Sequence, residues 1–271
     1  MAVLAIDYDG VIVDSDSKSL FIAYNAYNRI IQDSNNYIFG VKYLTFNNWE
    51  KVVKNYHKKI KAYKKLRPYA TNANGYLLII DLIKKGIIVN CQEDFDFRKK
   101  ELGFDKKEYF DEFYKEKERI HKINIFEASK LEPIHLNVFE GIKQFSSEGI
   151  DVFITTLNRK EDVLKYFNFN YPFFSNNIRD ILDIKYGENK IHQIKHIAKK
   201  YTINFNDIHF IDDQVSHLIQ TKMLGIHLYL AGWGYTSNEQ KKQARENNIP
   251  IIKSEKEFYP YIKRIIDNNL S

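Results

Sequence analysis

Short, mainly apolar runs recur along the chain, and polar or glycine residues follow each of them. The first run covers residues 2–6, and similar runs cover 150–154, 208–211, 226–230 and 249–252. Runs that are apolar on both faces are typical of parallel strands buried within a sheet. Segments with helical spacing separate the later runs. This alternation predicts an α/β fold with a doubly wound parallel sheet.

A long stretch after the first run has apolar residues at helical spacing instead. We expect helices over residues 20–31, 49–66 and 106–123, and a further helix over 76–89 that Gly86 ends. The second of these has one apolar stripe, formed by Val52, Val53, Tyr56, Ile60 and Tyr63, and its opposite face is basic. This stretch predicts a helical domain inserted into the part of the chain that forms the sheet.

The domain boundaries follow from this change of pattern. A helical segment at 138–147 comes just before the next strand-like run, and Pro133 marks the return to the sheet-forming part. We expect a Rossmann-like core, formed by residues 1–14 and 134–271, which a mainly α-helical cap of residues 15–133 interrupts. At 271 residues the chain is long enough for two modest domains with cores of their own.

Composition narrows the function only slightly. The net charge of +6 and the sequence pI near 9.0 suit an anionic substrate or nucleic acid, but lysine is abundant throughout the chain. Residues 51–67 carry eight basic and no acidic residues, which we interpret as a solvated helix face rather than a nucleic-acid surface. The single cysteine, Cys91, fits a reducing cytosol, and no apolar run approaches the roughly 18 residues of a membrane helix. We expect a cytoplasmic protein without a membrane partner, and the sequence leaves the oligomeric state open.

Two carboxylates follow the first apolar run, in the segment Asp7-Tyr8-Asp9-Gly10-Val11-Ile12-Val13-Asp14-Ser15. Side chains two residues apart in an extended segment point the same way, so Asp7 and Asp9 can address one point. Ligands of open α/β sheets bind beyond the carboxyl ends of the strands, and Gly10 lets the backbone turn close to a ligand. The pair therefore indicates acid–base or metal chemistry, the alternative being a turn held by local hydrogen bonds.

This segment resembles the first motif of the haloacid dehalogenase superfamily, in particular its phosphoglycolate-phosphatase-like branch. Later segments resemble further motifs of the family: Ile154-Thr155-Thr156, Phe210-Ile211-Asp212-Asp213-Gln214, and Gly225-Ile226-His227 with Gly232-Trp233-Gly234-Tyr235-Thr236. The resemblance thus spans both ends of the chain. It implies that Asp7 is the nucleophile and that Asp9 is the general acid and base. It also implies that a hydroxyl at Thr155 or Thr156 binds the phosphoryl group, and we favour Thr155.

The family's third motif is a lysine at the start of the helix that precedes the acidic strand. Lys190, in Gly187-Glu188-Asn189-Lys190-Ile191, lies at about this position. The branch usually has Lys-Pro here, whereas Ile191 follows Lys190, and both Lys185 and Lys195 compete for the role. We take Lys190 as the candidate phosphate-binding lysine.

Carboxylates that share a site need a cation. Three of them about 5 Å apart repel one another by roughly 3 kcal/mol per pair at an effective dielectric constant near 20, before an anionic phosphate arrives. We expect Mg²⁺, a hard and oxygen-preferring ion, held by Asp7, Asp213 and the backbone carbonyl of Asp9, with Lys190 offsetting more of the charge. Asp212 stands where the family has glycine, and it either helps to hold the metal or points away.

By resemblance, Asp7 attacks phosphorus to give an aspartyl-phosphate, and Asp9 protonates the leaving oxygen and then activates water. The superfamily's dehalogenases lack an acid at the position of Asp9 and its ATPase pumps have threonine, so Asp9 favours phosphoester hydrolysis or phosphomutase chemistry. We expect a Mg²⁺-dependent phosphatase of a small phosphorylated metabolite, with the cap closing over the site and selecting a substrate that the sequence does not identify. The alternatives are a sugar phosphomutase, a phosphatase of nucleic-acid ends, and a nucleic-acid-binding protein that uses the basic segment.

Overall fold

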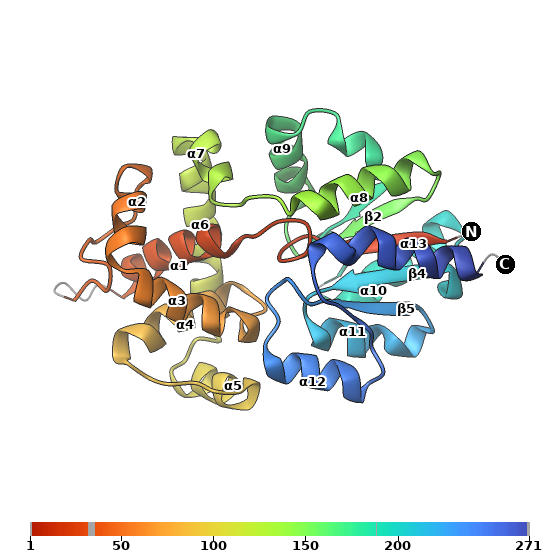
Figure 1. Ribbon diagram of the computed structural model, residues 1–271. Helices are drawn as coiled ribbons and strands as arrows, with labels where there is room; N and C mark the ends of the chain where they lie inside the picture. The colour runs from red at the N-terminus through yellow and green to blue at the C-terminus, as the bar shows by residue number, and fades with distance from the viewer. Residues whose placement is uncertain (1, 32–35, 188, 270–271) are drawn as a thin grey trace. The chain divides into compact units, whose positions relative to one another are not determined.

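The structure is a computed structural model that describes residues 2–31, 36–187 and 189–269. The chain forms two compact units (Figure 1). One combines Met1–Asp14 with Pro133–Ser271, and the other is Ser15–Glu132. The two ends of the first unit's segments at these boundaries meet, because the Asp14 N–H donates a hydrogen bond to the Pro133 carbonyl oxygen at 2.8 Å.

The first unit is built on a parallel sheet of six strands in the order β3-β2-β1-β4-β5-β6. The strands are β1 Val3–Asp7, β2 Val152–Thr155, β3 Asp180–Leu182, β4 Ile208–Asp212, β5 His227–Ala231 and β6 Ile251–Ile252. The predicted α/β class is confirmed. The chain leaves β1 towards β2 on one side and returns to β4 on the other, so the carboxyl ends of β1 and β4 flank the point where the strand order reverses.

Helices cover both faces of this sheet, and the alternation of side chains along β1 shows how. Leu4 and Ile6 pack into one apolar cluster, whereas Val3 and Ala5 pack into another. The first cluster includes residues of α8 Leu136–Ser147, α9 Lys160–Asn170 and α13 Phe258–Asn269, and the second includes residues of α10 Lys190–Tyr201, α11 Val215–Thr221 and α12 Asn238–Glu246. Because successive side chains of a strand point to opposite faces, an uninterrupted apolar run is what two covered faces require.

The strands lie where the apolar runs predict them, with one addition. The sequence analysis missed β3, which has only three residues and lies at the edge of the sheet. It begins with Asp180, whose carboxylate contacts Lys160 and Lys200. A run this short, opened by a charged residue, carries too little periodicity to predict a strand.

Among the described residues of the second unit, the regular elements are all helices. Its helices are α1 Asp16–Ile30, α2 Phe46–Asn55, α3 His57–Leu66, α4 Ala73–Lys85, α5 Gln92–Glu101, α6 Lys107–Ile123 and α7 Ile125–Lys130. They share one apolar cluster, to which α1, α4 and α6 contribute many residues. Gly86 ends α4 in a left-handed conformation with φ of 67°, as predicted. None of the helices in the described part of the chain has the length and apolar composition needed to cross a lipid bilayer.

The single helix predicted over residues 49–66 is wrong. The chain forms α2 and α3 there, with a break at Tyr56, whose φ of −119° and ψ of 27° are not helical. The Tyr56 ring packs edge-on against Phe39, and Val53 of the predicted stripe is exposed. Packing of one aromatic side chain thus overrides a helical pattern that is continuous in sequence.

Candidate active site

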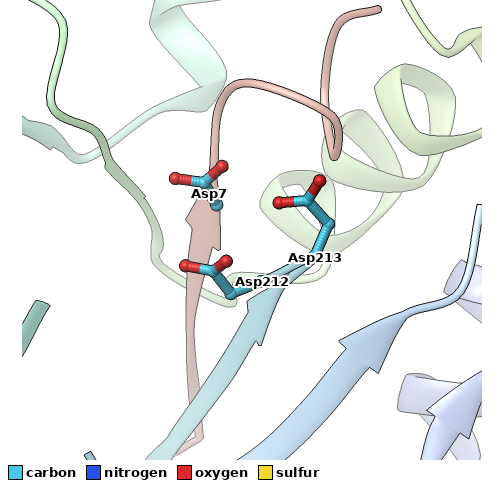
Figure 2. A group of neighbouring side chains, drawn as sticks. All are labelled: Asp7, Asp212 and Asp213. Atoms are coloured by element: carbon cyan, nitrogen blue, oxygen red, sulfur yellow. The ribbon is translucent and has the colours of Figure 1, made fainter. Parts of the chain in front are cut away.

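Three buried carboxylates meet at the carboxyl ends of β1 and β4 (Figure 2). Asp7 ends β1, Asp212 ends β4, and Asp213 follows directly. Each offers one oxygen such that the three oxygens lie within 4.8 Å of one another. The three residues are almost entirely shielded from solvent, with exposures of 8% for Asp7, 0% for Asp212 and 1% for Asp213. The parallel register pairs Ile6 with Ile211, which brings the strand ends side by side.

Lys190 lies beside this cluster, at the first residue of α10. Its Nζ donates hydrogen bonds to Asp7 Oδ1 and to the Thr155 carbonyl oxygen, the latter at 2.8 Å, and it lies 3.8 Å from Asp212 Oδ2. The other two candidates lie elsewhere: Lys185 is exposed and pairs with Glu161 at 2.8 Å, and Lys195 is exposed on α10. Of the three lysines that the sequence left open, the structure brings Lys190 to Asp7.

Burial and neighbouring charges shift the pKa values of Asp7, Asp212 and Lys190. Burial raises the pKa of Asp7 to about 7, and Lys190 opposes that rise, while the charges of Asp212 and Asp9 add to it. Burial also works against ionisation of Asp212, yet His217 and Lys190 hold the pKa of Asp212 below its usual value. Burial likewise opposes the charge of Lys190, but Asp7 and Asp212 keep its pKa above the usual value. One ammonium group therefore faces three carboxylates, and this excess of negative charge favours a bound cation.

Two glycines allow the loops around Asp213 to close tightly. Asp213 Oδ2 accepts a hydrogen bond of 2.6 Å from the Tyr235 backbone N–H. A Cβ added at Gly10, which has φ of +84°, would lie 2.3 Å from Asp213 Oδ2, and one added at Gly234 would lie 2.5 Å from Asp213 Cβ. The loops after β1 and β5 thus approach Asp213 at distances that only glycine permits.

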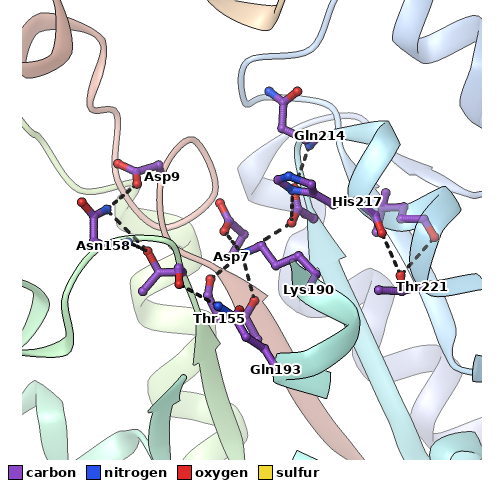
Figure 3. A network of polar contacts seen from close by, with 12 residues as sticks. Asp7, Asp9, Thr155, Asn158, Lys190, Gln193, Gln214, His217 and Thr221 are labelled. Atoms are coloured by element: carbon purple, nitrogen blue, oxygen red, sulfur yellow. Dashed lines mark hydrogen bonds and ion pairs between the residues drawn. The ribbon is translucent and has the colours of Figure 1, made fainter. Parts of the chain in front are cut away.

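Asp9 lies outside the group of three carboxylates. Its Oδ2 accepts a hydrogen bond of 2.5 Å from Asn158 Nδ2 (Figure 3), whose backbone N–H donates to Thr156 Oγ1 at 3.0 Å. The sequence argument joined Asp7 and Asp9 through the alternation of an extended strand, but β1 ends at Asp7 and the chain bends at Tyr8. Asp212 is therefore the third carboxylate of the cluster.

The two threonines differ in their surroundings. Thr155 pairs with Asp7 in the register of β1 and β2, and its Oγ1 accepts a hydrogen bond of 3.4 Å from Lys190 Nζ. The Thr156 hydroxyl accepts a hydrogen bond from the Asn158 backbone N–H. The Thr156 carbonyl oxygen accepts another, of 2.8 Å, from Gln193 Nε2. Thr155 accordingly lies beside Asp7 and Lys190, whereas Thr156 supports the loop that carries Asn158.

Two polar residues of this site were missed in the sequence. Asn158 follows Thr155 by three residues, in the loop after β2. This position after a strand end was the only feature of the sequence that could have marked it as a site residue. His217 lies on α11, with its Nδ1 3.0 Å from Asp212 Oδ2. It comes five residues after Asp212 and belongs to no motif, so only the fold reveals it.

The chain shares its fold with solved structures that are named as phosphatases, hydrolases and a phosphomutase. It aligns with a predicted phosphoglycolate phosphatase from Haemophilus somnus 129PT at 13% identity and a TM-score of 0.58, over 97% of this chain and 98% of the other. A haloacid dehalogenase-like hydrolase from Streptococcus pneumoniae aligns at 12% identity and a TM-score of 0.59, with the same coverage. A protein assigned by prediction as a beta-phosphoglucomutase from Thermotoga maritima aligns at 13% identity and a TM-score of 0.54, over 98% of this chain and 100% of the other. The expected fold of the haloacid dehalogenase superfamily is confirmed.

No model of a known protein family and no curated protein matches the sequence.

Proposed function

We propose that this protein is a Mg²⁺-dependent phosphatase that hydrolyses a small phosphorylated metabolite through an aspartyl-phosphate intermediate. The observation that carries the proposal is the buried arrangement of Asp7, Lys190 and the acidic pair Asp212 and Asp213 at the carboxyl edge of the sheet. The shared fold adds to it, because the aligned proteins include ones named as phosphatases.

Asp7 is the proposed nucleophile. It ends a central strand, so its backbone is fixed by β2 on one side and by β4 on the other. Lys190 donates to one of its oxygens and so holds the carboxylate in one orientation. When a phosphoryl group binds, the ammonium group and the Thr155 hydroxyl provide donors for its oxygens. These residues would position the phosphorus in line with the attacking oxygen of Asp7.

The cluster of three carboxylates fits a hard divalent cation. All the side-chain donors are oxygen atoms, and their charges are not balanced by Lys190. Asp7, Asp212 and Asp213 would hold Mg²⁺, together with the backbone carbonyl of Asp9, which lies in the loop that Gly10 turns back towards Asp213. When bound, the ion would offset carboxylate charge and stabilise the charge that develops on the transferred group.

Asp9 is the proposed general acid and base. Its carboxylate is close enough to influence the pKa of Asp7, and the bond from Asn158 fixes its orientation. In the first half of the reaction Asp9 would give a proton to the leaving oxygen. In the second half it would take one from the water that attacks the aspartyl-phosphate.

A sugar phosphomutase is the second candidate, because one protein of the same fold is assigned as a beta-phosphoglucomutase. A mutase would return the phosphoryl group to a sugar phosphate instead of releasing it to water. The nucleic-acid alternatives gain no support from the basic segment: Arg67 is buried, and Lys59 donates to the Ile38 carbonyl oxygen at 2.7 Å.

The deciding experiment is a screen that measures release of inorganic phosphate in Mg²⁺. The panel should contain small phosphorylated metabolites together with oligonucleotides that carry 5′- or 3′-phosphates. We expect net phosphate release from one class of metabolite, loss of that release on chelation, and recovery when Mg²⁺ is restored. Full activity in thoroughly metal-stripped enzyme would refute the roles of Asp7, Asp9 and Asp213. Isomerisation of a sugar phosphate without net phosphate release would identify the mutase.

A further inference from the structure

A cavity of about 430 Å³ lies against β6 and α12, and none of the residues assigned to the proposed reaction lines it. Three basic side chains line it, from Lys241, Arg245 and Lys253. Its remaining wall includes Ile249, Pro250 and Ile251. No acidic residue is among those that line it.

The three cations are not neutralised by the protein. Lys241 and Arg245 are one turn apart on α12 and so lie on the same face of the helix, where like charges repel. Across the described residues, no ion pair or hydrogen bond engages the charged ends of these three side chains. Lysines next to the cavity behave differently, because Lys242 pairs with Glu246 at 3.7 Å and Lys222 donates to the Asn247 carbonyl oxygen at 2.8 Å.

The wall of the cavity is held in place by the sheet. Gly232 lines it, and the Gly232 N–H donates to the Ile252 carbonyl oxygen at 2.8 Å. A Cβ added at Gly232 would lie 2.8 Å from that same oxygen, so the contact between the ends of β5 and β6 is as close as glycine allows. This contact therefore fixes the backbone of Gly232 at the wall of the cavity.

We propose that this cavity binds a small organic phosphate or polyphosphate, as an anion site separate from the proposed active site. Uncompensated lysine and arginine side chains from α12 and the end of β6 converge on a single space, and phosphate oxygens form charge-assisted hydrogen bonds with both residue types. The isoleucine and proline side chains provide an apolar surface for the organic part of the ligand. The volume lies within the range of about 300–1,000 Å³ that small-molecule sites occupy.

The test is calorimetric titration of the metal-free full-length protein, in the presence of a chelator, with inorganic pyrophosphate. Without metal, the carboxylates of the proposed active site repel this probe. We compare the wild type with the triple variant Lys241→Gln/Arg245→Gln/Lys253→Gln. The matched control is Lys222→Gln/Lys242→Gln/Lys256→Gln, which removes the same net charge from exposed positions that do not line the cavity.

We expect the wild type and the control to bind pyrophosphate with affinities within about threefold of each other. The cavity variant should bind about 30-fold more weakly, since each of these solvent-accessible cations contributes about threefold. Phenylphosphonate should bind the wild type more tightly than methylphosphonate does, because only the former has a ring for the apolar wall. Thermal unfolding of all three proteins checks that the fold is retained.

Three outcomes would overturn the proposal: no binding of pyrophosphate by the wild type, an equal loss in both triple variants, or equal affinity for the two phosphonates. Tighter binding of an oligonucleotide than of pyrophosphate, lost in the cavity variant, would also overturn it and assign the surface to nucleic acid. None of these results depends on the proposed phosphatase activity, because no turnover is measured.

Discussion

The close approach of two loops to Asp213 gives the sharpest prediction. Substitution of Gly10 by alanine places a Cβ 2.3 Å from Asp213 Oδ2, whereas ordinary contact begins at 3.4 Å. The carboxylate, the loop or both must therefore move by about 1 Å, and a displacement of this size in a preorganised site costs about 100-fold in rate. The hydrogen bond from Tyr235 to that oxygen would be strained at the same time.

The expected loss of stability has two parts. Alanine in the left-handed region costs about 1–2 kcal/mol, and overpacking adds about 1–3 kcal/mol. Gly225→Ala is the matched control, because its φ of +73° resembles the +84° of Gly10 while nothing lies within 4 Å of an added Cβ. It should lose only the first part, about 1–2 kcal/mol, and it should leave Asp213 in place.

Urea unfolding measures the two stabilities, and calorimetry measures Mg²⁺ affinity without requiring a known substrate. Phosphate release from p-nitrophenyl phosphate, or from a substrate identified in the screen, measures turnover. Gly10→Ala should bind Mg²⁺ more weakly and turn over about 100-fold more slowly, whereas Gly225→Ala should match the wild type in both. Equal Mg²⁺ affinity and turnover in the two variants would show that contact with Asp213 does not position a metal ligand.

Three further predictions concern other residues of the first unit. Asp7→Asn should lower turnover by about 10⁵-fold or more while the circular dichroism spectrum stays unchanged, because an amide cannot act as the nucleophile; near-wild-type phosphate release would contradict the mechanism. Asn158→Ala should lower kcat by about tenfold or more with KM nearly unchanged, since it frees the Asp9 carboxylate, and steady-state kinetics in which KM alone changes would assign Asn158 to substrate binding instead. Burial, with the charge of His227, lowers the pKa of His209 to about 4. The unfolded chain therefore binds the extra proton at His209 between about pH 4 and pH 6.5, so this group by itself should take up to about 3 kcal/mol from the stability of the folded protein as the pH falls through this range. His209→Gln should remove this contribution, so that its stability relative to the wild type rises by that amount in urea unfolding as the pH falls, and a constant difference would mean that His209 does not carry the shift.

The sequence by itself determined the elements that depend on local pattern. Buried parallel strands need apolar residues on both faces, so β1, β4 and β5 could be read from short, mainly apolar runs. The end of α4 followed from Gly86, because glycine adopts the left-handed conformation without steric cost.

The catalytic candidates Asp7 and Lys190 were likewise visible, because each lies at an element end in a motif that resembles a known family. Their closeness in space was implied only by that resemblance, and no local pattern of the residues shows it. They are 183 residues apart in sequence, and only the sheet and α10 bring the Lys190 ammonium group to the Asp7 carboxylate.

Tertiary structure alone decided which polar side chains meet. Local alternation grouped Asp9 with Asp7, but the chain bends after β1, and the pairing of β1 with β4 places Asp212 there instead. The contacts of Asn158 with Asp9 and of His217 with Asp212 depend on loop and helix positions that no short pattern encodes. Periodicity reports which face of a segment is buried, whereas the identity of a partner across the sheet depends on register and strand order, which are properties of the whole chain.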